Sequence, residues 1–102
     1  MATLFITEYQ TAASDQGRAL PLGHGFPVAK QVLGVGGVAT QSQPFSKYTH
    51  FVRLHADTIC SYLVGTAASP PTATTSDARM AANQTEYFGV DPGMLISVIA
   101  NA

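Results

Sequence analysis

The residues of this chain best suited to metal or nucleophilic chemistry are three histidines and one cysteine. His50 and His55 are five positions apart, a spacing that places them on opposite faces of a continuous strand. His24 lies in a Gly-rich segment, and its surroundings supply no carboxylate or thiolate that would complete a metal site. Cys60 lies within a predicted strand that is rich in apolar residues, which predicts a buried and inert thiol. The sequence therefore predicts no metal-binding residue and no catalytic nucleophile.

A glycine-rich stretch gives a second candidate chemistry. Residues 34–39 (GVGGVA) match the dinucleotide-binding pattern G-x-G-x-x-A, but that pattern must open a helix whose first turn binds a pyrophosphate. Pro44 follows closely and disfavours such a helix. Glu86 and Asp91 are interpreted as a strand-surface residue and a turn former, not as paired catalytic carboxylates. We expect no cofactor and no enzymatic activity.

Composition limits the partners of the chain. It has 102 residues, 11% of them charged, and a formal net charge of -1, so a basic surface for neutralising phosphates is not expected. The apolar runs fall short of the roughly 20 residues that span a bilayer. The N-terminal stretch lacks the basic residues that begin a signal peptide. We expect a single, soluble, non-exported domain over residues 1–102, with no nucleic-acid or membrane partner.

Short runs of β-branched and aromatic residues, separated by Gly, Pro, Asn or Asp, dominate the pattern. They predict an all-β fold, an antiparallel β-sandwich or small barrel of six to eight short strands. The expected strands are residues 4–9, 28–32, 35–40, 50–55, 58–64, 85–90 and 94–100, with a bulge or a positive φ at Gly36 and Gly37.

The connections between these strands are predicted from turn residues. Ala56-Asp57 is typical of a tight hairpin, and Asp91-Pro92-Gly93 of a type II turn that closes a second hairpin. Residues 1–9 are expected to be an edge strand or arm, residues 20–27 an irregular loop, and residues 65–83 a long surface loop with one helical turn over 76–82.

The low charge also bears on function. Few charged groups oppose burial against another chain, so the surface favours assembly with protein subunits, and the alternative is that Ser, Thr, Asn and Gln only solvate it. Exposed aromatic residues would instead favour a carbohydrate- or receptor-binding module, although the chain contains no Trp. The aromatic candidates are Tyr48, Phe51, Tyr62, Tyr87 and Phe88.

The second half of the chain is similar in sequence pattern to a known group of proteins. It contains FVRLHADTICSYLVG from Phe51, PTATTSDARMAAN from Pro71 and EYFGVDPGMLISVI from Glu86. This arrangement resembles small β-sandwich virion proteins of tailed bacteriophages, of the capsid decoration (cement) or head accessory type. The resemblance covers about half of the chain, and the first 45 residues add nothing to it.

The resemblance implies a non-enzymatic structural protein of the virion, made in the host cytoplasm and located on the capsid surface. Its partners would be the major capsid protein or other virion subunits, with self-association also favoured, and it would stabilise the shell by binding across the seams between capsid subunits. Deletion of residues 1–8 is expected to abolish particle binding and leave the domain folded. The expected contact residues are Leu4, Phe5, Ile6, Tyr9, His24, Phe26, Pro70, Pro71 and Thr72.

Overall fold

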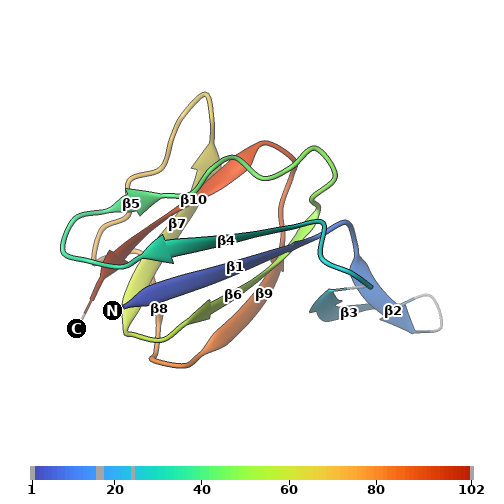
Figure 1. Cartoon of the computed structure of the whole chain (residues 1–102), viewed down its shortest axis with the longest axis horizontal. Helices are drawn as coiled ribbons and strands as arrows, with labels where there is room; N and C mark the ends of the chain where they lie inside the picture. Colours follow the sequence, from blue (N-terminus) through green and yellow to red (C-terminus); the bar gives the residue numbers. More distant parts are fainter. Residues whose placement is uncertain (1, 16–17, 24, 102) are drawn as a thin grey trace.

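The computed structural model describes residues 2–15, 18–23 and 25–101, and they form a β-sandwich (Figure 1). The first sheet has the order β4 (Ala29–Gly34), β1 (Thr3–Tyr9), β6 (Phe51–Ala56), β9 (Thr85–Gly89). The second has the order β5 (Thr40–Gln41), β10 (Met94–Ala100), β7 (Cys60–Thr66), β8 (Ala78–Met80). All pairs are antiparallel and the described residues contain no helix, so the all-β fold class is confirmed as a sandwich.

The core lies between the two sheets and follows the alternation of side chains along each strand. In β1, Leu4 and Ile6 are fully buried while Phe5, between them, faces outward. Ile96 and Val98 of β10 face them from the second sheet. The buried cluster also contains Leu33, Phe45, Val52, Leu54, Ala56, Cys60, Met80 and Val90.

The prediction that residues 1–9 form an edge strand or arm is wrong. β1 pairs with β4 over residues 3–8 on one side and with β6 over residues 4–9 on the other. Leu4 and Ile6 contribute apolar side chains to the core, and a strand with that pattern gains most from a central position.

The hairpin expected around Ala56-Asp57 is also wrong, because β6 and β7 belong to different sheets. Asp57 directs the chain away from β6. Its amide donates to the Thr3 carbonyl at 3.1 Å, and its carboxylate accepts the Thr3 amide at 2.6 Å. The two bonds hold the end of β6 against β1, so the chain crosses to the second sheet instead of pairing with β6.

The turn at Asp91-Pro92-Gly93 has its expected geometry but joins different strands from those predicted. Gly93 has a φ of 84°, and the Met94 amide donates to the Asp91 carbonyl at 3.2 Å, as a type II turn requires. However, β9 pairs with β6 and β10 pairs with β7, so the turn links the two sheets. The second predicted hairpin is therefore an inter-sheet connection.

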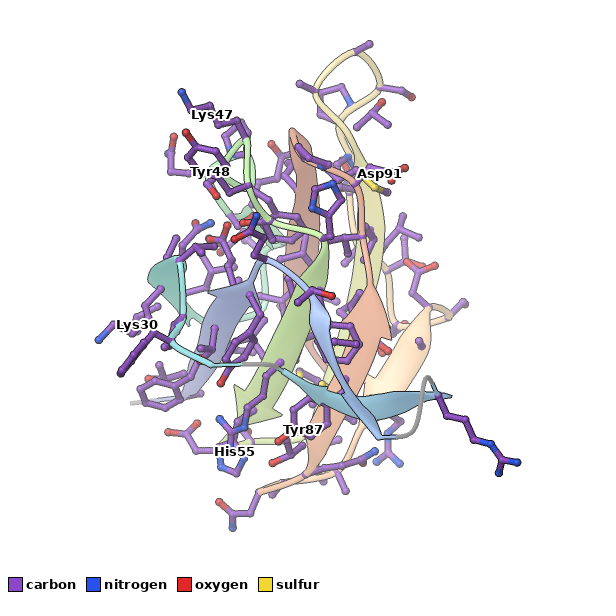
Figure 2. The ribbon with its side chains drawn as sticks, turned by 90° about the vertical axis from the view of Figure 1, so that its right-hand side faces the viewer. Lys30, Lys47, Tyr48, His55, Tyr87 and Asp91 are labelled. Atoms are coloured by element: carbon purple, nitrogen blue, oxygen red, sulfur yellow. The ribbon has the colours of Figure 1, made fainter. Side chains whose placement is uncertain are left out.

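A separate hairpin covers part of the outer face of the first sheet. β2 (Ala12–Asp15) pairs with β3 (Arg18–Gly23), and β3 contacts β6 and β9. Figure 2 shows this pair crossing in front of the sandwich. The cover explains why Phe51 is only 8% exposed on the outer face, where it stacks on Tyr87. Residues 20–23, expected to be irregular, form part of β3.

The segment after β7 covers the second sheet in a similar way. Pro71 and Ala73 are buried, and the Ala73 amide donates to the Ser97 hydroxyl at 2.9 Å. A Cβ atom at Gly65 would lie 2.9 Å from the Pro71 ring, so a glycine is required for this close approach. Residues 67–77 are therefore a surface loop that Pro71 and Ala73 anchor to the second sheet, and the helical turn expected over 76–82 is replaced by β8.

Candidate protein-interaction surface

The histidines do not converge on a common site. His50 precedes β6, where its Nδ1 lies 3.3 Å from the Tyr48 carbonyl, and His55 lies at the other end of β6, where its Nδ1 is 2.8 Å from the Thr85 hydroxyl. His24 lies outside the described residues. Among the described residues, no group of three His, Cys, Asp or Glu side chains is placed to hold a metal ion.

Cys60 and the glycine-rich stretch take structural positions. The Cys60 side chain is fully buried between the sheets. Burial raises the pKa of its thiol above the ordinary value of 9.0, and the negative charges of Glu86 and Asp57 raise it further. Residues 34–39 end β4 and lead into β5, without the helix that a pyrophosphate site needs. Positive φ at glycine occurs in the described residues at Gly25 and Gly93, not at Gly36 or Gly37.

Most of the aromatic candidates for sugar binding are used in packing. Tyr62 stacks on Phe88 with ring centroids 5.8 Å apart, and its hydroxyl donates to Glu86 at 3.3 Å. Burial and the charge of Glu86 raise the pKa of Tyr62. Tyr87 stacks on Phe51. Tyr48 differs, because 54% of it is exposed, with the Lys47 amine 5.1 Å from the ring centroid.

The structure divides the predicted contact residues into four groups. Leu4, Ile6 and Pro71 are buried and offer no surface to a partner, which corrects their assignment. Phe5, Phe26, Pro70 and Thr72 are exposed, Tyr9 is half-buried and His24 lies outside the described residues.

Large exposed apolar side chains gather on the outer face of the first sheet, on the half that the β2–β3 hairpin leaves uncovered. Phe5 of β1 is 42% exposed and lies directly across from Val32 of β4, which is 64% exposed. Val28, also exposed, directly precedes β4, and the exposed Phe26 comes two residues earlier. We call Phe5, Phe26, Val28 and Val32 the outer patch. Lys30 lies between Val28 and Val32, and Figure 2 shows it projecting outward.

A buried carboxylate anchors β1, which carries Phe5 of the outer patch. Glu8 is only 1% exposed and accepts the Thr49 hydroxyl at 2.8 Å, the Ser46 amide at 3.0 Å and the Gln31 side-chain amide at 3.0 Å. Because the Thr49 proton goes to Glu8, the Ser46 hydroxyl must be the donor in its 2.7 Å bond to Thr49. The network ties β4 and the loop before β6 to β1, so the backbone under the outer patch is held in place.

Two open depressions lie away from the outer patch. The first, about 390 Å³, lies between β7 and residues 69–72. The second, about 400 Å³, is lined by His50, Gly89, Val90, Asp91 and Met94. Lys47, Tyr48 and Asp91 lie at the same end of the molecule (Figure 2), so the exposed Tyr48 belongs to the same region as the second depression.

Comparison of the chain with protein-family models, with curated proteins and with solved structures found no match. The described residues also include no helix long and apolar enough to cross a membrane. The surface itself therefore carries the functional argument.

Val32 of the outer patch was missed in the sequence analysis. The sequence contained one relevant signal, since Val32 and Leu33 are adjacent and adjacent strand residues point to opposite faces. One of them had to lie outside the core or under a covering segment. Which one it was depended on the register of β4 against β1, which pairs Leu33 with the buried Leu4.

Proposed function

We propose that this protein is a non-enzymatic structural subunit of a virion, of the capsid decoration type, which binds other protein subunits through its outer patch. The observation that carries the proposal is the pair of exposed apolar side chains Phe5 and Val32 on an uncovered sheet face, with the exposed Phe26 and Val28 just before β4. Exposed apolar patches of this kind mark protein interaction sites, because their burial against a partner is favourable. The resemblance of residues 51–100 to decoration proteins of tailed bacteriophages supports the virion as the assembly.

The mechanism would be adhesion across a seam. A rigid sandwich that contacts two neighbouring capsid subunits at once must be detached before those subunits separate, so its binding energy adds to the stability of the shell. Simultaneous contacts also raise the apparent affinity well above that of either contact alone. The low charge of the chain, 11% of residues, keeps the desolvation cost of such contacts small.

The direct test is the copy number of this chain in purified particles from the source culture, measured by quantitative mass spectrometry against the major coat protein. Hundreds of copies per particle are expected for a decoration subunit. A few to a few dozen copies would indicate a neck, vertex or tail component and overturn the decoration assignment. Complete absence would overturn the virion proposal itself.

A matched pair of variants tests the surface. Phe26 is 92% exposed and Val38 is 81% exposed, and they lie before and after β4 respectively, so replacing either by serine removes little packing. Phe26→Ser is expected to lower occupancy on particles at least tenfold, while Val38→Ser leaves it unchanged. Equal occupancy for both variants would contradict a role for Phe26 in the outer patch.

The alternative function is a carbohydrate- or receptor-binding module. The observation that favours it is Tyr48, which is more than half exposed and lies at the end of the molecule that carries the second depression. If the chain is absent from particles, binding to a glycan array that is lost in Tyr48→Ala would establish this alternative. Tyr62 and Tyr87 are unsuitable probes, because both stack in the fold.

A further inference from the structure

β4 is the edge strand of the first sheet, and the Gln31 side chain bonds the amide and carbonyl of Gln43 beside it. Within the described part of the chain, β4 pairs with β1 only. The hydrogen-bond pattern shows which of its backbone groups are used, because antiparallel partners alternate between bonded and non-bonded pairs. The Val35 amide donates to the Ala2 carbonyl at 3.0 Å, so Leu33 and Gln31 also direct their backbone groups toward β1. Lys30, Val32 and Gly34 direct theirs toward the open edge.

A second bond supports this assignment from the other side of β1. The Asp57 amide donates to the Thr3 carbonyl at 3.1 Å. By alternation, the backbone groups of the odd-numbered residues of β1 then bond β6, and those of the even-numbered residues bond β4. The alternation is therefore consistent across three strands. The side chains of Lys30 and Val32 are also exposed, as is Gly34, so the strand is accessible where its backbone groups point outward.

We propose that β4 pairs antiparallel with β4 of a second copy of this chain, about a two-fold axis at Val32, so that the two first sheets become one continuous sheet. In this register Val32 faces the Val32 of the second copy and Lys30 faces its Gly34. The two-fold symmetry makes the contact self-complementary, because each copy supplies the same strand.

The chemistry of the strand favours this register over an axis at Lys30 or at Gly34, and it suits a second copy of the chain as the occupant. An axis at Lys30 would place two like charges opposite each other, which is destabilising, and an axis at Gly34 would leave both valines unpaired. An axis at Val32 instead aligns Phe5 and Val32 of one copy with Val32 and Phe5 of the other in one apolar row. The net charge of -1 adds little repulsion between copies.

This pairing rests on the first sheet alone and holds whether or not the protein belongs to a virion. If the proposed function is correct, the pairing also brings two outer patches side by side, and the dimer would then attach through a doubled surface.

The test is sedimentation velocity of the full chain over a concentration series from micromolar to millimolar, with two variants at position 32. Val32→Pro removes an amide that points toward the open edge and not toward β1, so proline is compatible with the monomer. Val32→Lys places two lysines at the axis. We expect the wild-type chain to dimerise and both variants to weaken dimerisation at least tenfold, with unchanged circular dichroism.

Val38→Lys is the matched control, since it puts the same charge on an exposed valine beyond the end of β4, and its dimerisation should equal that of the wild type. If Val32→Pro fails to fold, the dimerisation of Val32→Lys alone tests the proposal. A wild-type chain that stays monomeric throughout overturns the proposal, as does a dimer that Val32→Lys leaves intact.

Hydrogen exchange gives an independent readout of register. The amides of Lys30, Val32 and Gly34 should become more protected as concentration rises, while protection of the Leu33 amide, which faces β1, stays constant. Concentration-dependent protection confined to another strand edge would place the dimer contact there and overturn the assignment to β4.

Discussion

At the scale of single residues, the most informative side chain is Glu8. It is a carboxylate on the core face of a central strand, and three donors from β4 and the loop before β6 satisfy it. No described buried side-chain polar atom lacks a hydrogen-bond partner, so Glu8 is part of a fully satisfied network. Buried polar networks of this kind hold specific segments in register, because a partner removed from them leaves a costly unpaired group.

We therefore expect Glu8→Ala to lower the free energy of unfolding by at least about 2 kcal/mol, since each buried donor left without an acceptor costs about 1–3 kcal/mol. Glu8→Gln should have a smaller effect, because one oxygen remains. Urea denaturation measures both, with Asp91→Ala as the control at an exposed acid. Equal stability of Glu8→Ala and the control would show that the Glu8 network is dispensable.

At the scale of elements, the two segments that cover the outer faces of the sheets differ in how they are attached to the sandwich. Residues 67–77 contribute buried side chains and an amide bonded to Ser97, so they belong to the second sheet's packing. The β2–β3 hairpin is a separate pair of strands that rests on β6 and β9. β1, in contrast, is paired on both sides and carries core residues.

Deletion of the hairpin and deletion of β1 should consequently give opposite results. Ala12 and Gly23 face each other across the hairpin, so a two-glycine linker replacing residues 12–23 can close the gap. That variant should keep a cooperative thermal transition and expose Phe51 and Tyr87, which increases binding of a hydrophobic dye. Deletion of residues 1–8 should abolish the transition. A folded chain after the second deletion would contradict the central position of β1.

At the scale of the whole molecule, the fold couples stability to alkaline pH. Burial and nearby acidic groups raise the pKa of Cys60 above 9.0 and that of Tyr62 above 10.0. Both groups hold their protons more tightly in the folded chain than in the unfolded chain. Their contribution to stability is therefore complete below the unfolded pKa values and is lost as pH rises through the folded ones.

Near pH 7 these two groups should add no pH dependence to the free energy of unfolding. Above about pH 9 we expect the free energy of unfolding to decrease as pH rises. Urea denaturation between pH 7 and pH 11 measures the slope. Cys60→Ala lowers stability at every pH because it leaves a cavity, so the comparison concerns the slope, which should flatten in Cys60→Ala and in Tyr62→Phe. An identical slope in both variants and the wild type would show that Cys60 and Tyr62 do not cause the loss of stability at alkaline pH.

The sequence determined the strands β1, β4, β6, β7, β9 and β10 and several local geometries, but not β2, β3 or β8. Alternating apolar residues indicated β1, β6 and β10, and Pro92-Gly93 indicated the turn with a positive φ at Gly93, because side-chain period and backbone freedom are local properties. Only the tertiary structure decided the partners of each strand. The same short connection joins strands within one sheet or between two sheets, and long-range contacts select between them, such as the bonds of Asp57 to Thr3. The outer patch depends on those partners too, because Val32 faces outward only when Leu33 pairs with Leu4, and the hairpin that buries Phe51 leaves Phe5 exposed.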